Sequence, residues 1–415
     1  MIDTPAQSTN AQLRKNETSP ARSLRSEGPF FHAPERAQTV FSIWITAAAV
    51  PLVAGVVLFG WRVLLVAGIS IGSCVFFERL YFRVTRTPAL LGRTHAYLTG
   101  LLLALTLPPF VPWYVPVVGG IFSAIVAKAM FGGIGHFLWQ PALVGRLAVA
   151  AIFGSTINPS YWGVLGQDRL LVGDIRQVRM VEDYAGWRGK MVPAGADGFA
   201  LPPVWTKLAG LTQPGPAAQF SALAYVPADL PAAKPAALAG LPPISDLFYG
   251  VTPGGIGETC AVIIAITGLY LVYRGYVGWH LPVAVLAGAW ITAAVFPVRL
   301  AGPADVVRVV YWPILSEGLD VGFTYVSYQM LAGELVLTAF FLATEMTSRP
   351  LTRAGGVLFG LSAGAIGMFL RLRFGLTIPF YIAVLGMNTL TPMIDSLCLR
   401  RTSASRWKRR RVRDF

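Results

Sequence analysis

Long apolar stretches alternate with short polar turns along most of the chain. The apolar runs occupy residues 40–60, 63–81, 96–109, 112–131 and 141–154, and then residues 259–274, 281–298, 331–344, 355–372 and 379–398. A membrane-spanning helix needs about 20 mostly apolar residues, because each residue adds about 1.5 Å across a hydrocarbon core about 30 Å thick. The pattern therefore predicts an all-α polytopic membrane protein with about ten transmembrane helices.

Polar segments divide the chain around these two series of helices. Residues 1–39 are rich in Ser, Thr, Ala and Arg, which predicts a disordered cytoplasmic tail. Residues 40–154 and 259–398 are predicted to be two five-helix halves. Between them, residues 155–258 are too polar and too rich in proline to cross a bilayer, so they are predicted to form an extramembrane loop. Residues 399–415 are predicted to form a basic cytoplasmic tail.

Composition indicates that lipid is the main surrounding of the chain. Charged residues make up 13% of it and apolar residues 54%, whereas soluble domains carry about 25% charged residues. The net charge of +14 does not indicate nucleic-acid binding, because the basic residues gather at the termini and in the turns between apolar runs. The three cysteines, Cys74, Cys260 and Cys398, are far apart and form no CxxC pair. We therefore expect neither a disulfide framework nor a cysteine-based metal site.

Basic residues also predict the orientation of the chain. Arginines follow the second and eighth apolar runs, at positions 79, 83, 86, 93, 349 and 353. Cytoplasmic turns carry an excess of Lys and Arg, so these turns are predicted to be cytoplasmic. Both termini are then cytoplasmic as well, and the long loop lies on the outer side.

Two of the apolar runs are short and resemble each other. Residues 98–104 match residues 337–343, which predicts an internal duplication of five plus five helices. Short or broken helices at equivalent positions in two halves of a transporter point to a binding site near the middle of the membrane. The alternative is that both runs are ordinary tilted helices.

A glycine-rich segment before the sixth apolar run is the first candidate site. Its backbone amides and the positive end of the following helix predict a docking place for an anion or a flavin. The candidate cofactor-binding residues are Gly254, Gly255, Gly257, Glu258 and Thr259, together with Thr99 on the short third run. The alternative is a glycine-rich turn in which Glu258 only favours the start of the next helix.

Acidic residues in or beside apolar runs are the second group of candidates. An ionisable side chain in hydrocarbon costs about 3 kcal/mol, so Glu334, Glu345 and Asp395 are candidates for an ion pathway. In the alternative interpretation they lie at membrane edges, solvated by headgroups. Lys128 and Arg146 flank the glycine-rich residues 131–136 and are interpreted as side chains that extend to the headgroups. The alternative is that this turn holds a phosphate from the cytoplasmic side. The sequence indicates no catalytic residue and no metal site.

Six segments together carry a resemblance to a known family: residues 99–109, 128–135, 141–146, 254–259, 339–345 and 388–395. They are similar to the D subunit of Rnf-type electron-transport complexes and to the B subunit of the sodium-pumping NADH:quinone reductase. The resemblance implies a subunit of a redox-driven complex in a bacterial cytoplasmic membrane. Its implied partners are other membrane and peripheral subunits, the lipid bilayer, and Na⁺ or H⁺, and the chain is not expected to be catalytic alone.

The resemblance also implies FMN esterified to a threonine in a Ser/Thr-Gly-Ala-Thr motif. This chain has no such motif, and Leu201, which has no oxygen to esterify, stands at the closest aligned position. The family's Asp-Gly-Ser-Ala before Thr99 likewise reads Arg-Thr-His-Ala, with His95 in place of serine. We therefore predict a divergent member in which any FMN or riboflavin is bound non-covalently near Gly254. The alternative is a cofactor-free permease or structural membrane scaffold with the same fold.

Overall fold

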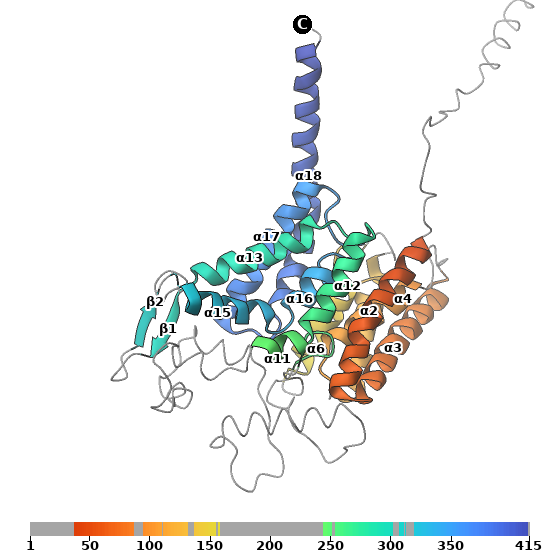
Figure 1. The fold of residues 1–415 in the computed structure, drawn as a ribbon. Coiled ribbons are helices and arrows are strands. Elements are labelled where there is room, and N and C mark those ends of the chain that lie inside the picture. Colours follow the sequence, from red (N-terminus) through yellow and green to blue (C-terminus); the bar gives the residue numbers. More distant parts are fainter. Residues whose placement is uncertain are drawn as a thin grey trace, which may run out of the picture. The chain divides into compact units, whose positions relative to one another are not determined.

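The computed structural model describes residues 37–86, 94–109, 111–131, 137–154, 157, 244–250, 254–301, 307–310, 312 and 319–413. These residues form helices and one short antiparallel hairpin (Figure 1). The hairpin pairs β1 (Val298–Ala301) with β2 (Val307–Val310), and Val298 lies opposite Val310. The prediction of an all-α membrane protein is confirmed apart from this hairpin, which the apolar pattern did not predict.

The first half contains helices of very different length. They are α2 (Ala37–Phe59), α3 (Arg62–Thr85), α4 (Thr94–Thr106), α5 (Tyr114–Ile121) with the π-helical η1 (Phe122–Val126) and the 3₁₀ turn η2 (Ala129–Phe131), and α6 (Pro141–Ile152). Helix α4 ends just before Pro108 and Pro109, because proline has no amide to continue a helix. Helix α6 begins at Pro141, and the Gln140 side chain accepts a 2.7 Å hydrogen bond from the Leu143 amide.

The second half is built from eight further segments. They are α11 (Ile244–Tyr249), α12 (Ala261–Tyr273), α13 (His280–Val295), α15 (Leu319–Leu331), α16 (Leu335–Leu337), the π-helical η5 (Thr338–Leu342), α17 (Arg353–Phe374) and α18 (Pro379–Arg413). Thr352 caps α17 by accepting a 3.0 Å hydrogen bond from the Gly355 amide, and α17 ends at Gly375 with φ 58°. Glycine adopts positive φ without the steric cost that other residues meet there.

Every apolar run predicted from the sequence coincides with a helix, yet the count of ten transmembrane helices is not confirmed. Among the described residues, four helices are long and apolar enough to cross a membrane: 38–59, 62–85, 114–131 and 353–374. A bent pair, 322–331 with 335–342, makes a fifth if it is taken as one span. The remaining apolar helices, which include α4, α6, α12 and α13, are shorter.

The eighth run differs from its predicted form. Helix α15 precedes it and was not predicted, because Asp320 and Gln329 interrupt its apolar pattern. The chain then bends by 65° at a break that contains Gly333, whose φ is 77°. The two matched segments also differ in geometry: residues 98–104 are regular α-helix, whereas most of residues 337–343 are π-helical. The internal duplication stays a prediction.

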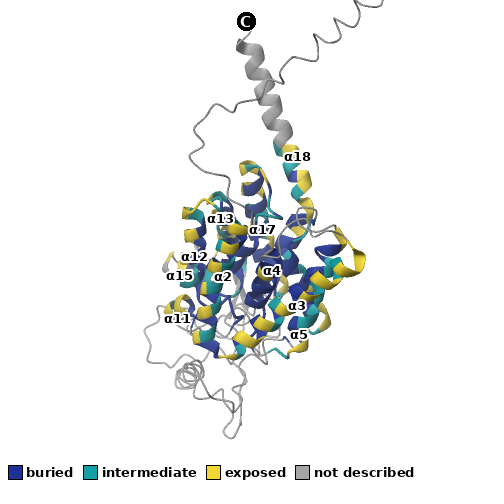
Figure 2. Ribbon diagram, turned by 90° about the vertical axis from the view of Figure 1, so that its right-hand side faces the viewer, coloured by how far each residue is buried: buried dark blue, intermediate teal, exposed yellow. Residues whose placement is uncertain are grey.

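Buried residues line the faces where helices meet, and exposed residues lie on the outer faces (Figure 2). Helix α3 packs against α4 and α5, and α17 packs against α13 and α18. Glycines allow the closest of these contacts, since a Cβ at Gly288 would collide with the Leu361 carbonyl oxygen. Exposed apolar residues such as Val53, Leu64 and Phe76 would be unfavourable in water, but they suit a helix that faces lipid.

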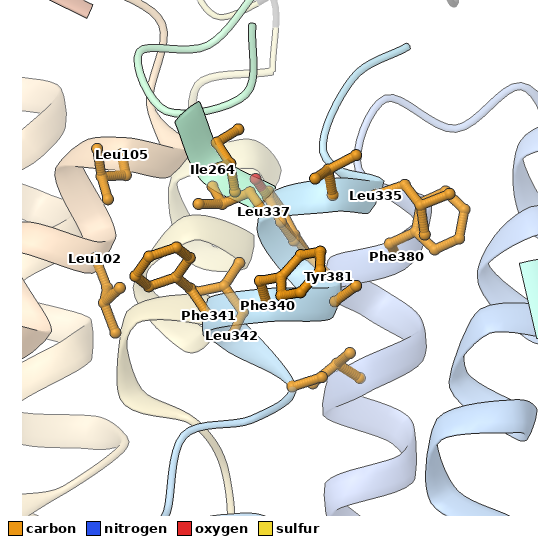
Figure 3. Packing of buried hydrophobic residues seen from close by; sticks show 14 of the residues in the cluster. Leu102, Leu105, Ile264, Leu335, Leu337, Phe340, Phe341, Leu342, Phe380 and Tyr381 are labelled. Atoms are coloured by element: carbon orange, nitrogen blue, oxygen red, sulfur yellow. The ribbon is translucent and has the colours of Figure 1, made fainter. Parts of the chain in front are cut away.

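Buried apolar side chains from both halves pack together (Figure 3). We call Leu102, Leu105, Leu337, Phe341 and Leu342 the apolar layer, because all five have no exposed surface. Side chains from α4, α12, η5 and α18 meet there.

Candidate functional site

Helix α4 ends inside the protein, where its last carbonyl groups need partners. Three donors supply them: the Gly257 amide to Leu105 O (2.8 Å), the Arg146 Nε to Thr106 O (2.8 Å) and the Ile256 amide to Leu107 O (3.0 Å). The glycine-rich segment of the second half thus completes a helix of the first. Residues 254–258, the last part of the predicted extramembrane loop, are buried against α4.

Glu258 lies at the centre of this contact and is 5% exposed. The Tyr381 hydroxyl donates a 2.5 Å hydrogen bond to its Oε1, and the Gly255 amide donates a 3.3 Å bond to its Oε2. The guanidinium of Arg146 is close enough for its charge to interact with Glu258, and its Nη1 has no hydrogen-bond partner among the described residues. A carboxylate and an arginine from different halves therefore share one buried volume.

A second buried pair lies beside the first. Arg371 donates 2.9 Å hydrogen bonds to the carbonyls of Gln329 and Ala332, so it satisfies the end of α15 at the break. Its Nη2 lies 3.3 Å from Glu334 Oε2, and the Phe380 amide donates to Glu334 Oε1 at 3.3 Å. Glu334 and Glu258 are close enough for their charges to interact. We call Arg146, Glu258, Glu334, Arg371 and Tyr381 the arginine–glutamate cluster.

Another charged group surrounds the opposite end of α4. His95 Nε2 lies 3.0 Å from Glu345 Oε1, and both side chains are buried. Lys128 Nζ donates to both oxygens of Glu78 at 2.7 Å, and its charge also interacts with Glu345. We call Glu78, His95, Lys128 and Glu345 the histidine–lysine cluster. It is confined by packing, as the Phe41 ring contacts His95 edge-on at 5.1 Å.

The two π-helical segments place charges in this second cluster. In η1 the Ala127 amide bonds to Phe122 O at 2.9 Å, and Lys128 is the next residue. In η5 the Ala343 amide bonds to Thr338 O at 2.8 Å, and Glu345 follows shortly after. Single π-helical turns occur often at functional sites, because they reorient the residues that follow.

The apolar layer separates the two clusters. His95 and Thr106 lie near opposite ends of α4, which corresponds to about 16 Å along the helix axis at 1.5 Å per residue. Leu102 and Leu105 lie between them on α4, facing Phe341 and Leu337 (Figure 3). The structure therefore holds ionisable groups on both sides of the apolar layer.

The structure corrects the sequence-based interpretation of several charged residues. Lys128 and Arg146 do not extend to headgroups, since they are 1% and 2% exposed and have partners inside the protein. Glu334 and Glu345 are also buried, so the interpretation as solvated acids at membrane edges is wrong for them. Each has a partner of opposite charge or a histidine, which offsets the cost of burying a charge.

Asp395 lies apart from both clusters. Its carboxylate accepts hydrogen bonds from the amides of Leu351 and Thr352, at 3.1 to 3.3 Å, and one from the Thr352 hydroxyl at 3.3 Å. These bonds join α18 to the turn before α17. Of the predicted ion-pathway residues, Asp395 therefore holds two parts of the chain together. Glu334 and Glu345, in contrast, are buried beside the apolar layer.

The glycine-rich segment does not fit a flavin in the arrangement observed. The amides of Gly255, Ile256, Gly257 and Glu258 all donate to the protein itself. A Cβ at Gly257 would lie 2.7 Å from Leu105 Cβ, and one at Gly254 would lie 2.7 Å from Thr259 Cγ2. These glycines permit close packing of the chain on itself. The prediction of a flavin stays untested, and Leu201 lies outside the described residues.

Both threonines of the predicted cofactor site are buried. The Thr99 hydroxyl donates to the His95 carbonyl at 3.0 Å, as a threonine inside a helix commonly does. The Thr259 hydroxyl has no hydrogen-bond partner among the described residues. Thr99 belongs to the end of α4 near His95, whereas Thr259 lies beside Glu258, so the structure does not bring the two together.

Sequence reasoning did not identify His95, Tyr381 or Arg371 as site residues. The sequence does contain a feature that marks Arg371, because this residue is charged and lies inside the apolar run 355–372. His95 is also marked by the sequence, since it replaces a serine in the family pattern. No feature of the sequence marks Tyr381, because a single tyrosine in an apolar helix is common.

The fold and the buried clusters define a multi-pass membrane protein with ionisable groups enclosed between interrupted helices. The chain belongs to the NQR2, RnfD, RnfE family, whose sequence profile matches residues 24–404. This agrees with the resemblance found in the sequence.

Three relatives illustrate the similarity, and each is the D subunit of a larger complex. The chain is 29% identical to the D subunit of the ion-translocating oxidoreductase complex of Halorhodospira halophila, and the match covers 89% of this chain and 92% of the relative. It is 26% identical to the D subunit of the proton-translocating ferredoxin:NAD⁺ oxidoreductase complex of Clostridium ljungdahlii, over 93% of this chain and 96% of the relative. It is 27% identical to the D subunit of the Na⁺-translocating ferredoxin:NAD⁺ oxidoreductase complex of Acetobacterium woodii, over 89% of this chain and 92% of the relative.

Proposed function

We propose that this chain is the membrane-embedded D-type subunit of a redox-driven, ion-translocating electron-transport complex. Near full-length similarity to subunits named in this way supports the proposal. Its partners are then the other membrane and peripheral subunits of the complex. The observation that carries the proposal is the buried carboxylate of Glu345 after the π-helical turn η5, across the apolar layer from a second charged cluster.

This arrangement suits coupled transport. An ion that reached Glu345 would find a charged group but no continuous polar route, because the apolar layer lies beyond it. A dry barrier of this kind prevents leakage, so an ion crosses only when the helices around the layer rearrange. Interrupted helices are suited to such a rearrangement, because their hydrogen-bond ladders are already broken at Gly333 and at the π-helical turns.

We further propose that the chain resides in a bacterial cytoplasmic membrane with both termini in the cytoplasm. Support comes from Arg83 and Arg86 at the end of α3, which are exposed, and from Arg353 at the start of α17. The helix α18 also continues past its apolar part into an arginine-rich segment that ends at Arg413. Positive residues of this kind favour the cytoplasmic side.

The test of the transport role uses the whole complex, purified and reconstituted in lipid vesicles. Electron flow from ferredoxin to NAD⁺, the reaction named for two relatives, is started while ion uptake is followed. We expect Glu345→Gln to lower ion uptake per electron by at least about tenfold, since the variant cannot bind or release charge. Asp395→Asn serves as the matched control and should retain most of the uptake. A native complex that transfers electrons without moving any ion would instead favour the scaffold role.

A separate measurement tests for flavin. The visible absorption spectrum of the purified chain is recorded before and after acid precipitation. Flavin bands in the supernatant would support non-covalent FMN or riboflavin, and bands in the pellet would indicate a covalent link. A colourless chain, isolated from an intact complex, would favour the cofactor-free permease, which agrees with the closed packing of the segment at Gly257.

A further inference from the structure

Helix α18 continues well past its apolar part. It begins at Pro379 and ends at Arg413, and its last turns stand clear of the other helices (Figure 1). Among the described side chains, the exposed apolar ones nearest this end are Met393 and Leu397, which are 61% and 55% exposed and suit contact with lipid. At 1.5 Å per residue, residues 406–413 lie about 14 to 24 Å beyond Leu397 along the helix axis. The end of α18 is therefore an extension beyond the hydrocarbon.

This extension is strongly basic. Residues 406–413 read Arg-Trp-Lys-Arg-Arg-Arg-Val-Arg, and we call them the basic arm. No acidic residue occurs in the sequence between Asp395 and Asp414. Like charges three or four positions apart, such as Arg406 and Arg410, destabilise a helix. Since the basic arm has no neutralising charge of its own, an anionic partner would stabilise it as a helix.

The region from which the arm extends is also positive. The turn before α17 carries Arg349 and Arg353, and the charges of both act on His280 at the start of α13. Asp395 of α18 lies at this turn, but its carboxylate already accepts hydrogen bonds from two amides and one hydroxyl of the turn. The basic arm therefore continues a positively charged region of the protein.

We infer that the basic arm docks on an acidic surface of a peripheral subunit, on the side of the membrane where the chain ends. The inference rests on the proposed function, which makes this chain one subunit of a complex, and it specifies the surface that holds a peripheral partner. Opposite charges across an interface speed association and select the partner. A second copy of this chain does not fit, because its net charge is also positive, at +14.

A lipid surface suits the basic arm less well. Headgroups extend about 6 Å beyond the hydrocarbon, and their attraction falls off within a Debye length of about 8 Å. Most of the basic arm lies further from Leu397 than these two distances combined. A helix that lies on a membrane also needs one apolar face. At 3.6 residues per turn, however, Trp407 and Val412 occupy different sides of the helix, and basic positions occur all around it.

The test uses the whole complex, purified in detergent at low salt, and measures the amount of each subunit by mass spectrometry. In the tested variant all six Lys and Arg residues of the basic arm are replaced by Gln. We expect the amount of one peripheral subunit per copy of this chain to fall at least about fivefold, because the charge complementarity is lost. The matched control replaces the five arginines by Lys, which keeps the charge, and should retain the subunit.

The other outcomes are distinct. Native subunit content in the variant with six Gln residues would overturn the docking and leave the proposed function intact. A native chain that purifies with no other subunit would contradict the proposed function itself.

A photo-reactive residue identifies the occupant without removing a charge. In Trp407→benzoylphenylalanine, illumination of the whole complex should link position 407 to a peripheral subunit, at a peptide rich in Asp and Glu. Raising NaCl to about 0.5 M should suppress this adduct, because salt screens contacts between exposed charges. An adduct with lipid alone, or with a second copy of this chain, would overturn the inference. So would the absence of any adduct in a complex that contains all its subunits.

Discussion

The backbone amide of Gly257 donates a 2.8 Å hydrogen bond to the carbonyl oxygen of Leu105. This bond joins the segment before α12 to the end of α4, two parts of the chain separated by the long polar loop. In a membrane an unsatisfied carbonyl cannot turn to water, so a helix that ends inside the protein needs such a partner. The second half therefore supplies hydrogen-bond partners for the end of a short helix in the first half.

Substitution of Gly257 tests this dependence. A Cβ at this position would lie 2.7 Å from Leu105 Cβ and 3.1 Å from its carbonyl oxygen. We expect Gly257→Ala to push the segment away from α4 and to lower the free energy of unfolding by about 1–3 kcal/mol. Thermal unfolding in detergent measures the effect. Gly386→Ala is the control, since a Cβ there would have no neighbour within 4 Å. Equal melting temperatures for the two variants would contradict the prediction.

The hydroxyl of Tyr381 is the only uncharged side-chain group in the arginine–glutamate cluster. Removing it by Tyr381→Phe leaves Glu258 without its 2.5 Å partner in a buried site. Hydrogen bonds to charged groups contribute about 1.5–3 kcal/mol, and we expect a loss of that order. Tyr325→Phe is the matched comparison, because it breaks only a 3.3 Å bond with the neutral Gln329 side chain. The same unfolding assay should show the smaller loss for Tyr325→Phe, and the reverse order would refute this role of Tyr381.

Arg371 both caps α15 and pairs with Glu334. Arg371→Met leaves the carboxylate buried without its partner, a change that costs about 3–5 kcal/mol in comparable pairs. We expect the variant to be strongly destabilised or absent from the assembled complex. The double variant Arg371→Met with Glu334→Met should recover part of the loss, because it removes the isolated charge. Arg373→Met, on the exposed side of α17, should have little effect. A double variant no better than Arg371→Met would show that the ion pair is not the cause.

Orientation has a direct test. If both termini are cytoplasmic, a fluorescent reporter fused after Phe415 should be active, and a periplasmic phosphatase fused at the same position should not. A phosphatase inserted within the loop 158–243 should be active, since we place this loop on the outer side. The opposite pattern would reverse the topology.

Much of the fold could be predicted because lipid imposes simple requirements. Runs of apolar residues located every helix from α2 to α6 and from α12 to α18 except α15, which carries Asp320 and Gln329. The shortness of α4 followed from Pro108 and Pro109. The break at Gly333 was less accessible, since a glycine inside an apolar run does not by itself show whether a helix bends.

The candidate site could be predicted only in part. Glu334 and Glu345 stood out because charge is costly in an apolar run, and Glu258 stood out because it lies in the glycine-rich segment. Their partners did not, since Tyr381 and His95 lie far from them in the sequence. Lys128 and Arg146 were interpreted as headgroup-facing because a long basic side chain can reach either lipid headgroups or a buried acid. Only the tertiary structure shows whether an acid lies within reach.

The sequence by itself therefore determined that this protein is a helical membrane protein of the NQR2, RnfD, RnfE family, because hydrophobic spacing and short motifs are local properties. The tertiary structure alone decided that Gly257 completes α4, that two charged clusters lie on either side of an apolar layer, and that His95 contacts Glu345. Those relationships join residues from both halves, and hydrogen bonds of this kind depend on atomic distances that no local pattern encodes.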